Sequence, residues 1–154
     1  MGFSLIGTII AVLMLLPSMI FFTKFPPRNV PAGLKDAPML YTMLERAGQA
    51  GCFGLLIFAG DALRLAGPRA LWAVLMLICM VIYYSLWIRY VLKGQEFATL
   101  WRPVLFIPIP LAVFPVCAFG FAALWGRSLW LGAATVVLAL GHCAVTWNSY
   151  KQVR

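Results

Sequence analysis

Seven side chains at the ends of three apolar segments have types and spacings that suit ligand binding. Glu45 and Gln49 are four residues apart and would share one face of a helix. Tyr83, Trp87 and Tyr90 follow one another at i, i+4 and i+7, which makes an aromatic stripe on another helix. The full set of candidate ligand-binding residues is Glu45, Arg46, Gln49, Trp87, Arg89, Tyr90 and His142.

An acid, two arginines and a histidine could together bind an anion and move a proton. Arginine holds phosphate and carboxylate groups well, and histidine exchanges protons near neutral pH. Arg46 points about 100° away from its neighbour Glu45 on a helix, so Glu45 needs a partner from another helix. We expect that partner to be Arg89 or His142, and we expect Glu45, Arg89 and His142 to surround one pocket.

The same residues also have purely structural interpretations. Tyrosine and tryptophan near a helix end are typical of the interfacial belt of membrane proteins. Arg89 and Lys93 could extend to lipid headgroups, and His142 could simply hydrogen-bond another helix. Asp61 and Arg64, three residues apart, are expected to form a helix-end pair. The concentration of polar residues at one end of the expected helices favours a shared site.

Sequence motifs of known catalytic centres are absent. The chain has no G-x-S-x-G, H-E-x-x-H, P-loop or G-x-G-x-x-G pattern. Its four cysteines stand singly inside apolar runs, and there is one histidine, which argues against a disulfide framework, a zinc site or haem. We therefore assign no catalytic residue, no metal and no cofactor from the sequence.

The composition indicates that these residues are carried by a membrane protein. Of the 154 residues, 64% are hydrophobic and only 10% are charged, and the mean hydropathy is +0.96. A small soluble domain could not bury so much apolar surface, so lipid is the expected solvent and partner. No polar stretch is long enough for a second domain, so residues 1–154 form one helical domain. The net charge of +8 is spread between the apolar segments, which fits lipid headgroups and not nucleic acid.

Five apolar segments are each close to the length of about 20 residues that a membrane-spanning helix needs. The second is the shortest, and its helix is expected to begin earlier, near Pro38 or Met39. The first has no Lys or Arg before it and no A-x-A-like cleavage site after it, which favours a mature helix over a signal peptide. The segments run over about 3–22, 49–65, 71–92, 103–125 and 129–147.

The basic residues predict the orientation of a five-helix bundle. Five spans place nine Lys and Arg on one side and three on the other, and the richer side is expected to be cytoplasmic. The N-terminus is then outside and the C-terminus inside, as in a multi-pass protein of the bacterial inner membrane. The nine are Lys24, Arg28, Lys35, Arg46, Arg89, Lys93, Arg102, Lys151 and Arg154, and the three are Arg64, Arg69 and Arg127.

Two sequence features shape the expected bundle. The fourth segment contains Pro108, Pro110 and Pro115, which remove backbone donors, so we predict a kink or a non-helical turn within residues 107–115. The alternative is a permanently bent helix that only shapes the bundle. In the fifth segment Gly132 and Gly141 are expected to permit close contact between helices.

The five-helix architecture, the Pro26-Pro27 loop and the six tryptophans resemble the tryptophan-rich sensory (translocator) protein family. This resemblance implies binding of porphyrins or sterol-like lipids. The tryptophans usual around the family's loop prolines are absent, so no ligand-binding residue is carried over. The stretch LERAGQAG, residues 44–51, is similar at Glu45 and Arg46 to the second helix of the membrane-associated glutathione and eicosanoid metabolism family. The asparagine and glutamate that follow there are missing here.

Three functions remain open on the sequence alone. The first is binding or transport of a small amphipathic or anionic molecule through a cytoplasm-facing cavity formed by the seven candidates. The second is a membrane enzyme acting on a lipid-soluble substrate, with Arg46 and Arg89 holding an anionic group and His142 or Tyr90 moving a proton. The third is a structural or accessory subunit without a ligand. In each case the protein could assemble as a homo-oligomer.

Overall fold

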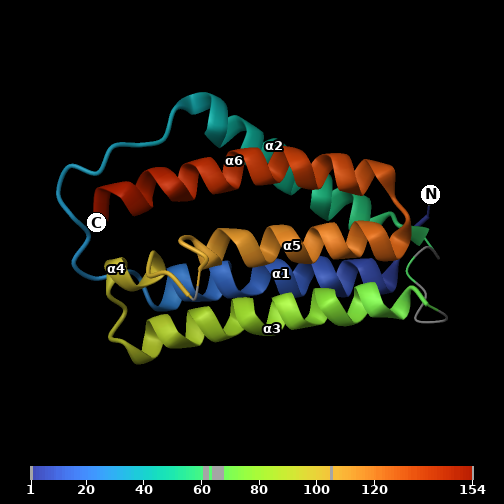
Figure 1. The fold of residues 1–154 in the computed structure, drawn as a ribbon, viewed down its shortest axis with the longest axis horizontal. Coiled ribbons are helices and arrows are strands. Elements are labelled where there is room, and N and C mark those ends of the chain that lie inside the picture. Colours follow the sequence, from blue (N-terminus) through green and yellow to red (C-terminus); the bar gives the residue numbers. More distant parts are fainter. Residues whose placement is uncertain (1, 61–62, 64–67, 105, 154) are drawn as a thin grey trace.

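The computed structural model describes residues 2–60, 63, 68–104 and 106–153, and within these ranges the chain is all helical apart from its connections. The five long helices lie side by side and run alternately in opposite directions, while the short helix α4 lies at one end of the bundle (Figure 1). Their bounds are α1 Leu5–Lys24, α2 Met39–Ile57, α3 Ala70–Leu92, α4 Phe97–Leu100, α5 Pro110–Gly126 and α6 Leu129–Val153.

Local signals explain most of the helix boundaries. The Ser4 side chain accepts a hydrogen bond from the Gly7 amide and caps the start of α1. Helix α2 begins directly after Pro38, as expected, but it ends at Ile57 and so falls short of the expected end near residue 65. Helix α6 runs to Val153, six residues beyond the expected end. The expected Asp61–Arg64 pair lies outside the described residues.

The fourth apolar segment is not one helix from residue 103, which corrects the expected span. After α4 the chain makes a tight turn in which Val104 and Ile107 exchange backbone hydrogen bonds of 3.1 and 3.0 Å. Helix α5 begins only at Pro110, because proline suits the first helical turn, where its missing N–H is not needed. The predicted non-helical turn within residues 107–115 is therefore confirmed at 107–109, whereas Pro115 is accommodated inside the helix.

The long helices pack in a ring. Helix α2 packs mainly on α6, α6 also contacts α5, and α5 packs on α3, while α1 contacts both α2 and α3. The α2–α6 contact is the most extensive, and it brings the two backbones very close together. A Cβ atom at Gly141 would overlap the backbone of Glu45, and one at Gly48 would overlap the backbone of Leu138. The close contact expected at Gly141 is thus confirmed.

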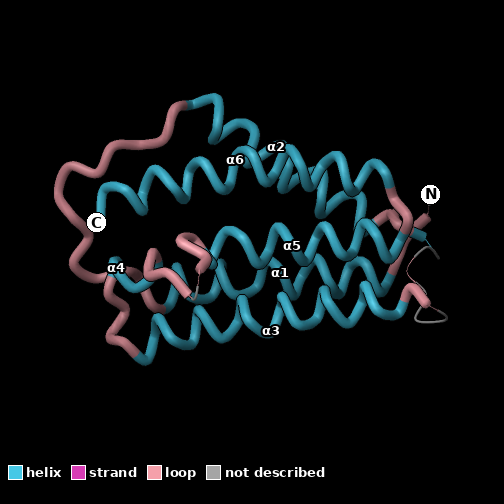
Figure 2. The backbone as a smooth tube through the Cα atoms, viewed as in Figure 1, coloured by secondary structure: helices cyan, strands magenta, loops and turns pink. Residues whose placement is uncertain are grey.

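The loop between α1 and α2 covers the end of the bundle that carries α4 and the C-terminus (Figure 2). On one side Arg28 exchanges backbone hydrogen bonds with the α3–α4 connection, from its amide to Gln95 and from Phe97 to its carbonyl. On the other side both backbone groups of Lys35 bond the amide side chain of Gln152 on α6. The loop therefore ties α4 to the end of α6.

The structure supports a helical-bundle membrane protein. Among the described helices, α1, α3 and α6 are long and apolar enough to cross a membrane. Helix α5 is apolar but has only 17 residues, because the turn at 101–109 takes up the beginning of its segment. Large apolar side chains stay exposed along these helices, Val81 at 68% and Val136 at 60%, as expected for surfaces in contact with lipid.

Candidate functional site

A carboxylate–imidazole pair joins α2 to α6. His142 Nδ1 lies 2.5 Å from Glu45 Oε1, and both side chains are largely buried, with 26% and 16% of their surfaces exposed. Ionisable groups inside a membrane protein are costly unless they are paired, and they mark functional sites more often than other buried residues do. The expectation that Glu45 pairs with a residue of another helix is confirmed, and His142 is that residue.

The glycine at the helix crossing brings this pair together. Gly141 precedes His142 and has no side chain, so α6 can lie directly on the backbone of α2 at Glu45. The fixed crossing then holds the carboxylate against Nδ1 of the imidazole. A carboxylate that accepts the Nδ1 proton sets the tautomer of a neutral histidine and leaves Nε2 with a free lone pair.

His142 also lines a cavity of about 110 Å³ on the axis of the ring. Residues from α1, α3, α5 and α6 surround this cavity, and α4 closes it toward the end of the bundle. Since α2 contributes Glu45 through His142, every helix takes part in this site. We call it the central cavity, and its lining is Ser18, Phe22, Tyr83, Trp87, Leu100, Trp101, Leu111, His142 and Thr146.

Tyr83 and Trp87 give the central cavity an aromatic wall with polar atoms. The Trp87 ring stacks on Phe21 with centroids 5.2 Å apart, and its edge contacts Tyr83 and Tyr90. Its indole N–H meets no acceptor in hydrogen-bonding geometry among the described residues, although the Tyr83 hydroxyl lies close to it. A buried N–H without an acceptor is uncommon, since most such groups find a partner in the protein, in water or in a ligand.

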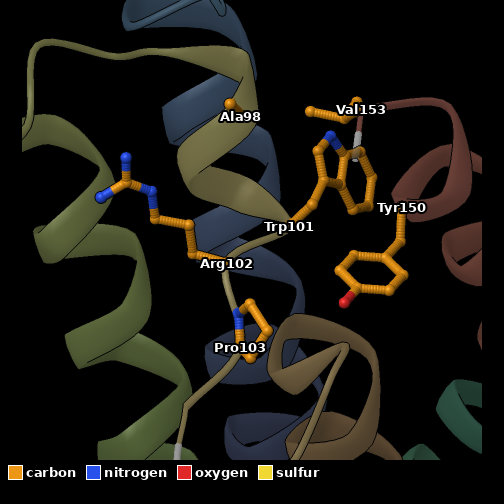
Figure 3. A pocket seen from close by; sticks show the side chains of 6 residues that line it. All are labelled: Ala98, Trp101, Arg102, Pro103, Tyr150 and Val153. Atoms are coloured by element: carbon orange, nitrogen blue, oxygen red, sulfur yellow. The ribbon is translucent and has the colours of Figure 1, made fainter.

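Trp101 separates the central cavity from a second, open pocket at the end of the bundle. This pocket, which we call the vestibule, has a volume of about 310 Å³ and is lined by Ala98, Trp101, Arg102, Pro103, Tyr150 and Val153. Figure 3 shows the Trp101 and Tyr150 rings next to each other, with the Arg102 side chain directed away from them toward α3. Because Trp101 belongs to both linings, its ring is the wall between the vestibule and the central cavity.

Arg89 does not join Glu45 and His142, so two of the three residues expected around one pocket come together. Its guanidinium donates through Nη2 to the carbonyls of Thr99 and Arg102, at 3.4 and 3.2 Å. Both carbonyls flank Trp101, at the end of α4, where a helix leaves carbonyl groups without partners. Arg89 therefore fixes the segment that closes the central cavity, and it acts through Trp101.

The remaining candidates lie at different distances from the cavity. The hydroxyl of Tyr90, which is almost fully buried, donates to the Phe25 carbonyl at 2.9 Å, and its ring supports Trp87 from behind. Gln49 is half-buried one turn after Glu45 on α2. Arg46 is exposed and lines a separate groove with Lys35 on the outer surface of α2. Of the seven candidates, Trp87 and His142 line the central cavity, and Glu45 supports it directly.

Sequence reasoning missed Trp101 and underrated Tyr83 as lining residues. Tyr83 belonged to the recognised aromatic stripe, so its spacing could have placed it beside Trp87. Trp101 could not be placed, because its position depends on the turn at 101–109, which folds α4 back over the bundle. Ser18 and Leu111 reach the cavity only because α1 and α5 complete the ring.

Comparisons with protein-family models, curated proteins and solved structures give no match to this chain. Its fold and site are therefore interpreted from its own residues, and the resemblance to the tryptophan-rich sensory protein family stays a prediction.

Proposed function

We propose that the protein is a five-span membrane protein that binds a small amphipathic molecule in its central cavity. In this proposal α1, α2, α3, α5 and α6 cross a bacterial inner membrane, with the N-terminus outside and the vestibule facing the cytoplasm. The distribution of cations supports this orientation. Lys24, Lys93 and Lys151 all lie at the α4 end of the bundle, whereas Arg69 and Arg127 lie at the opposite end.

One observation carries the proposal: helices distant in sequence converge on an aromatic cavity that holds polar atoms and contains a buried N–H without an acceptor. Packing alone does not require such a cavity, since protein interiors are normally filled to crystal-like density. The Trp87 N–H and the Tyr83 hydroxyl point to a ligand with an acceptor oxygen, and the surrounding rings point to a flat apolar body.

The size of the cavity limits the ligand. An apolar cavity of about 150 Å³ accepts benzene, so about 110 Å³ suits a molecule no larger than roughly one aromatic ring with a small substituent. The vestibule leads to the same place through Trp101. A ligand entering from the cytoplasm would pass Arg102 and Tyr150 and then displace the Trp101 ring.

The test compares two probes of the same shape. Acetophenone has a carbonyl oxygen where α-methylstyrene has a CH₂ group. Both are titrated into the purified protein in lipid nanodiscs, with empty nanodiscs as the baseline for partitioning into lipid. We expect acetophenone to bind more tightly by about threefold to tenfold, because one net hydrogen bond contributes about 0.5–1.5 kcal/mol.

Two neighbouring tyrosines supply matched variants for this test. Tyr83→Phe removes one hydroxyl from the cavity wall, whereas Tyr84→Phe removes a hydroxyl that donates to the Leu13 carbonyl outside the cavity. The preference for acetophenone should shrink in Tyr83→Phe and persist in Tyr84→Phe. Absence of saturable binding of both probes, or an equal preference in the two variants, would refute the proposal and favour a structural subunit without a ligand.

The Glu45–His142 pair favours a second candidate, a membrane enzyme acting on a lipid-soluble substrate. A histidine oriented by a carboxylate is a common general base, and here it faces a cavity that excludes bulk water. Mass spectrometry of bound probes after long incubation distinguishes the candidates, since an enzyme releases a chemically altered molecule and a binding protein returns the probe unchanged.

A further inference from the structure

We infer that the central cavity selects weak acids, and that His142 accepts the proton of the acid as it binds. This inference rests on the proposed function, because it names the class of ligand for the same cavity. Three observations lead to it: the Glu45–His142 pair, the position of His142 in the cavity wall, and the polar atoms of Tyr83 and Trp87 in the same wall.

The geometry gives His142 one nitrogen for structure and one for chemistry. Nδ1 is engaged by Glu45 on the α2 side of the ring, so Nε2 is the nitrogen left for the cavity that His142 lines. Imidazole is the side chain suited to exchanging a proton near neutral pH. A ligand hydroxyl or carboxyl can therefore donate to Nε2, while a second polar atom of the ligand reaches the Trp87 N–H.

Proton transfer is balanced within the site. The O–H bond of the ligand breaks, a new N–H bond forms at Nε2, and the electron pair of the broken bond stays on the ligand oxygen. The ligand becomes an anion and His142 becomes an imidazolium between that anion and the Glu45 carboxylate. The total charge of the site does not change, so a neutral acid can enter from an apolar surrounding and be held as an ion pair.

Few other groups in the lining compete for this proton. From α2 the facing group is the Glu45 carboxylate, and from α3 it is the Tyr83 phenol, whose neutral form is a donor. Arg89 on α3 is bonded to the α4 segment. The groups that α1, α4, α5 and α6 add to the lining do not titrate: Ser18, Phe22, Leu100, Trp101, Leu111 and Thr146.

The probe for this inference is 4-nitrophenol, whose phenolate is yellow and whose neutral form is nearly colourless. It is added to the protein in nanodiscs at a pH about one unit below its own pKa, where most of the free probe is neutral. We expect the bound probe to show the phenolate absorbance, and excess acetophenone to abolish it by competing for the cavity. Nitrobenzene, which fits wherever 4-nitrophenol fits, serves as the control without an acidic proton.

Two variants separate the proton acceptor from the cavity itself. His142→Asn keeps a donor close to the position of Nδ1, and so retains a partner for Glu45, but it removes Nε2. Glu45→Gln keeps an acceptor for Nδ1–H but removes the charge that balances the imidazolium. Both should bind nitrobenzene within about twofold of the original protein, and both should lose most of the phenolate signal.

The outcomes distinguish this inference from the proposed function. If the unmodified protein binds 4-nitrophenol in its neutral, colourless form, the proton transfer is refuted and binding in the cavity stands. If neither 4-nitrophenol nor nitrobenzene binds, the proposed function itself fails. The absorbance of the unmodified protein with its probe decides the matter even where a variant does not fold.

Discussion

The most direct structural prediction concerns Gly141, because this residue sets the distance between α2 and α6. A Cβ atom at this position would lie 2.6 Å from Glu45 Cα and still closer to the Glu45 amide nitrogen, whereas ordinary contacts begin near 3.4 Å. In Gly141→Ala the two helices must therefore separate by at least about 0.8 Å. The obstacle is backbone on both sides, so rotation of a side chain cannot relieve the overlap.

The expected cost follows from this overlap. Inserting a methyl group into a tightly packed contact costs about 1–3 kcal/mol, and we expect the upper end here. The same separation would lengthen the Glu45–His142 contact from 2.5 Å to about 3.3 Å, near the limit of a hydrogen bond. Gly141→Ala should therefore lower the stability of the protein and also weaken the phenolate signal of bound 4-nitrophenol.

Gly132→Ala is the matched control on the same helix. Its new Cβ atom would lie 4.0 Å from the Ala123 Cβ, which is ordinary contact, so the substitution should be neutral or stabilising by up to about 1 kcal/mol through helix propensity. Equilibrium unfolding in mixed micelles should then separate the two variants by about 3 kcal/mol. If Gly141→Ala is as stable as Gly132→Ala, the proposed backbone contact between α2 and α6 is wrong.

Two further predictions test the α4 segment and the orientation. Arg89→Ala releases the carbonyls that flank Trp101 and should weaken acetophenone binding about fivefold, whereas Arg127→Ala at the opposite end should leave it within twofold; equal effects in the same titration would contradict the role given to Arg89. Reporter fusions should place the N-terminus outside and the C-terminus in the cytoplasm, and both termini on one side would exclude five spans.

Several features could be predicted from the sequence because they depend on neighbouring residues. The apolar segments predicted the long helices, and Pro38 predicted the start of α2. Pro108 and Pro110 predicted the non-helical turn, since proline disrupts a helix wherever that helix would lie. The need of Glu45 for a partner on another helix followed from the cost of an unpaired carboxylate in an apolar surrounding.

Tertiary structure alone decided which residues meet. From the sequence Arg89 was as suitable a partner for Glu45 as His142, yet the fold at 93–109 presents carbonyl groups to Arg89 and occupies it there. Trp101 became the wall of the cavity for the same reason, because the turn after α4 returns the chain over the bundle. The choice of His142 depended on the crossing at Gly141. Spacing along a helix determines which side chains share a face, but the approach of two helices, set by the smallest residues between them, determines which faces come into contact.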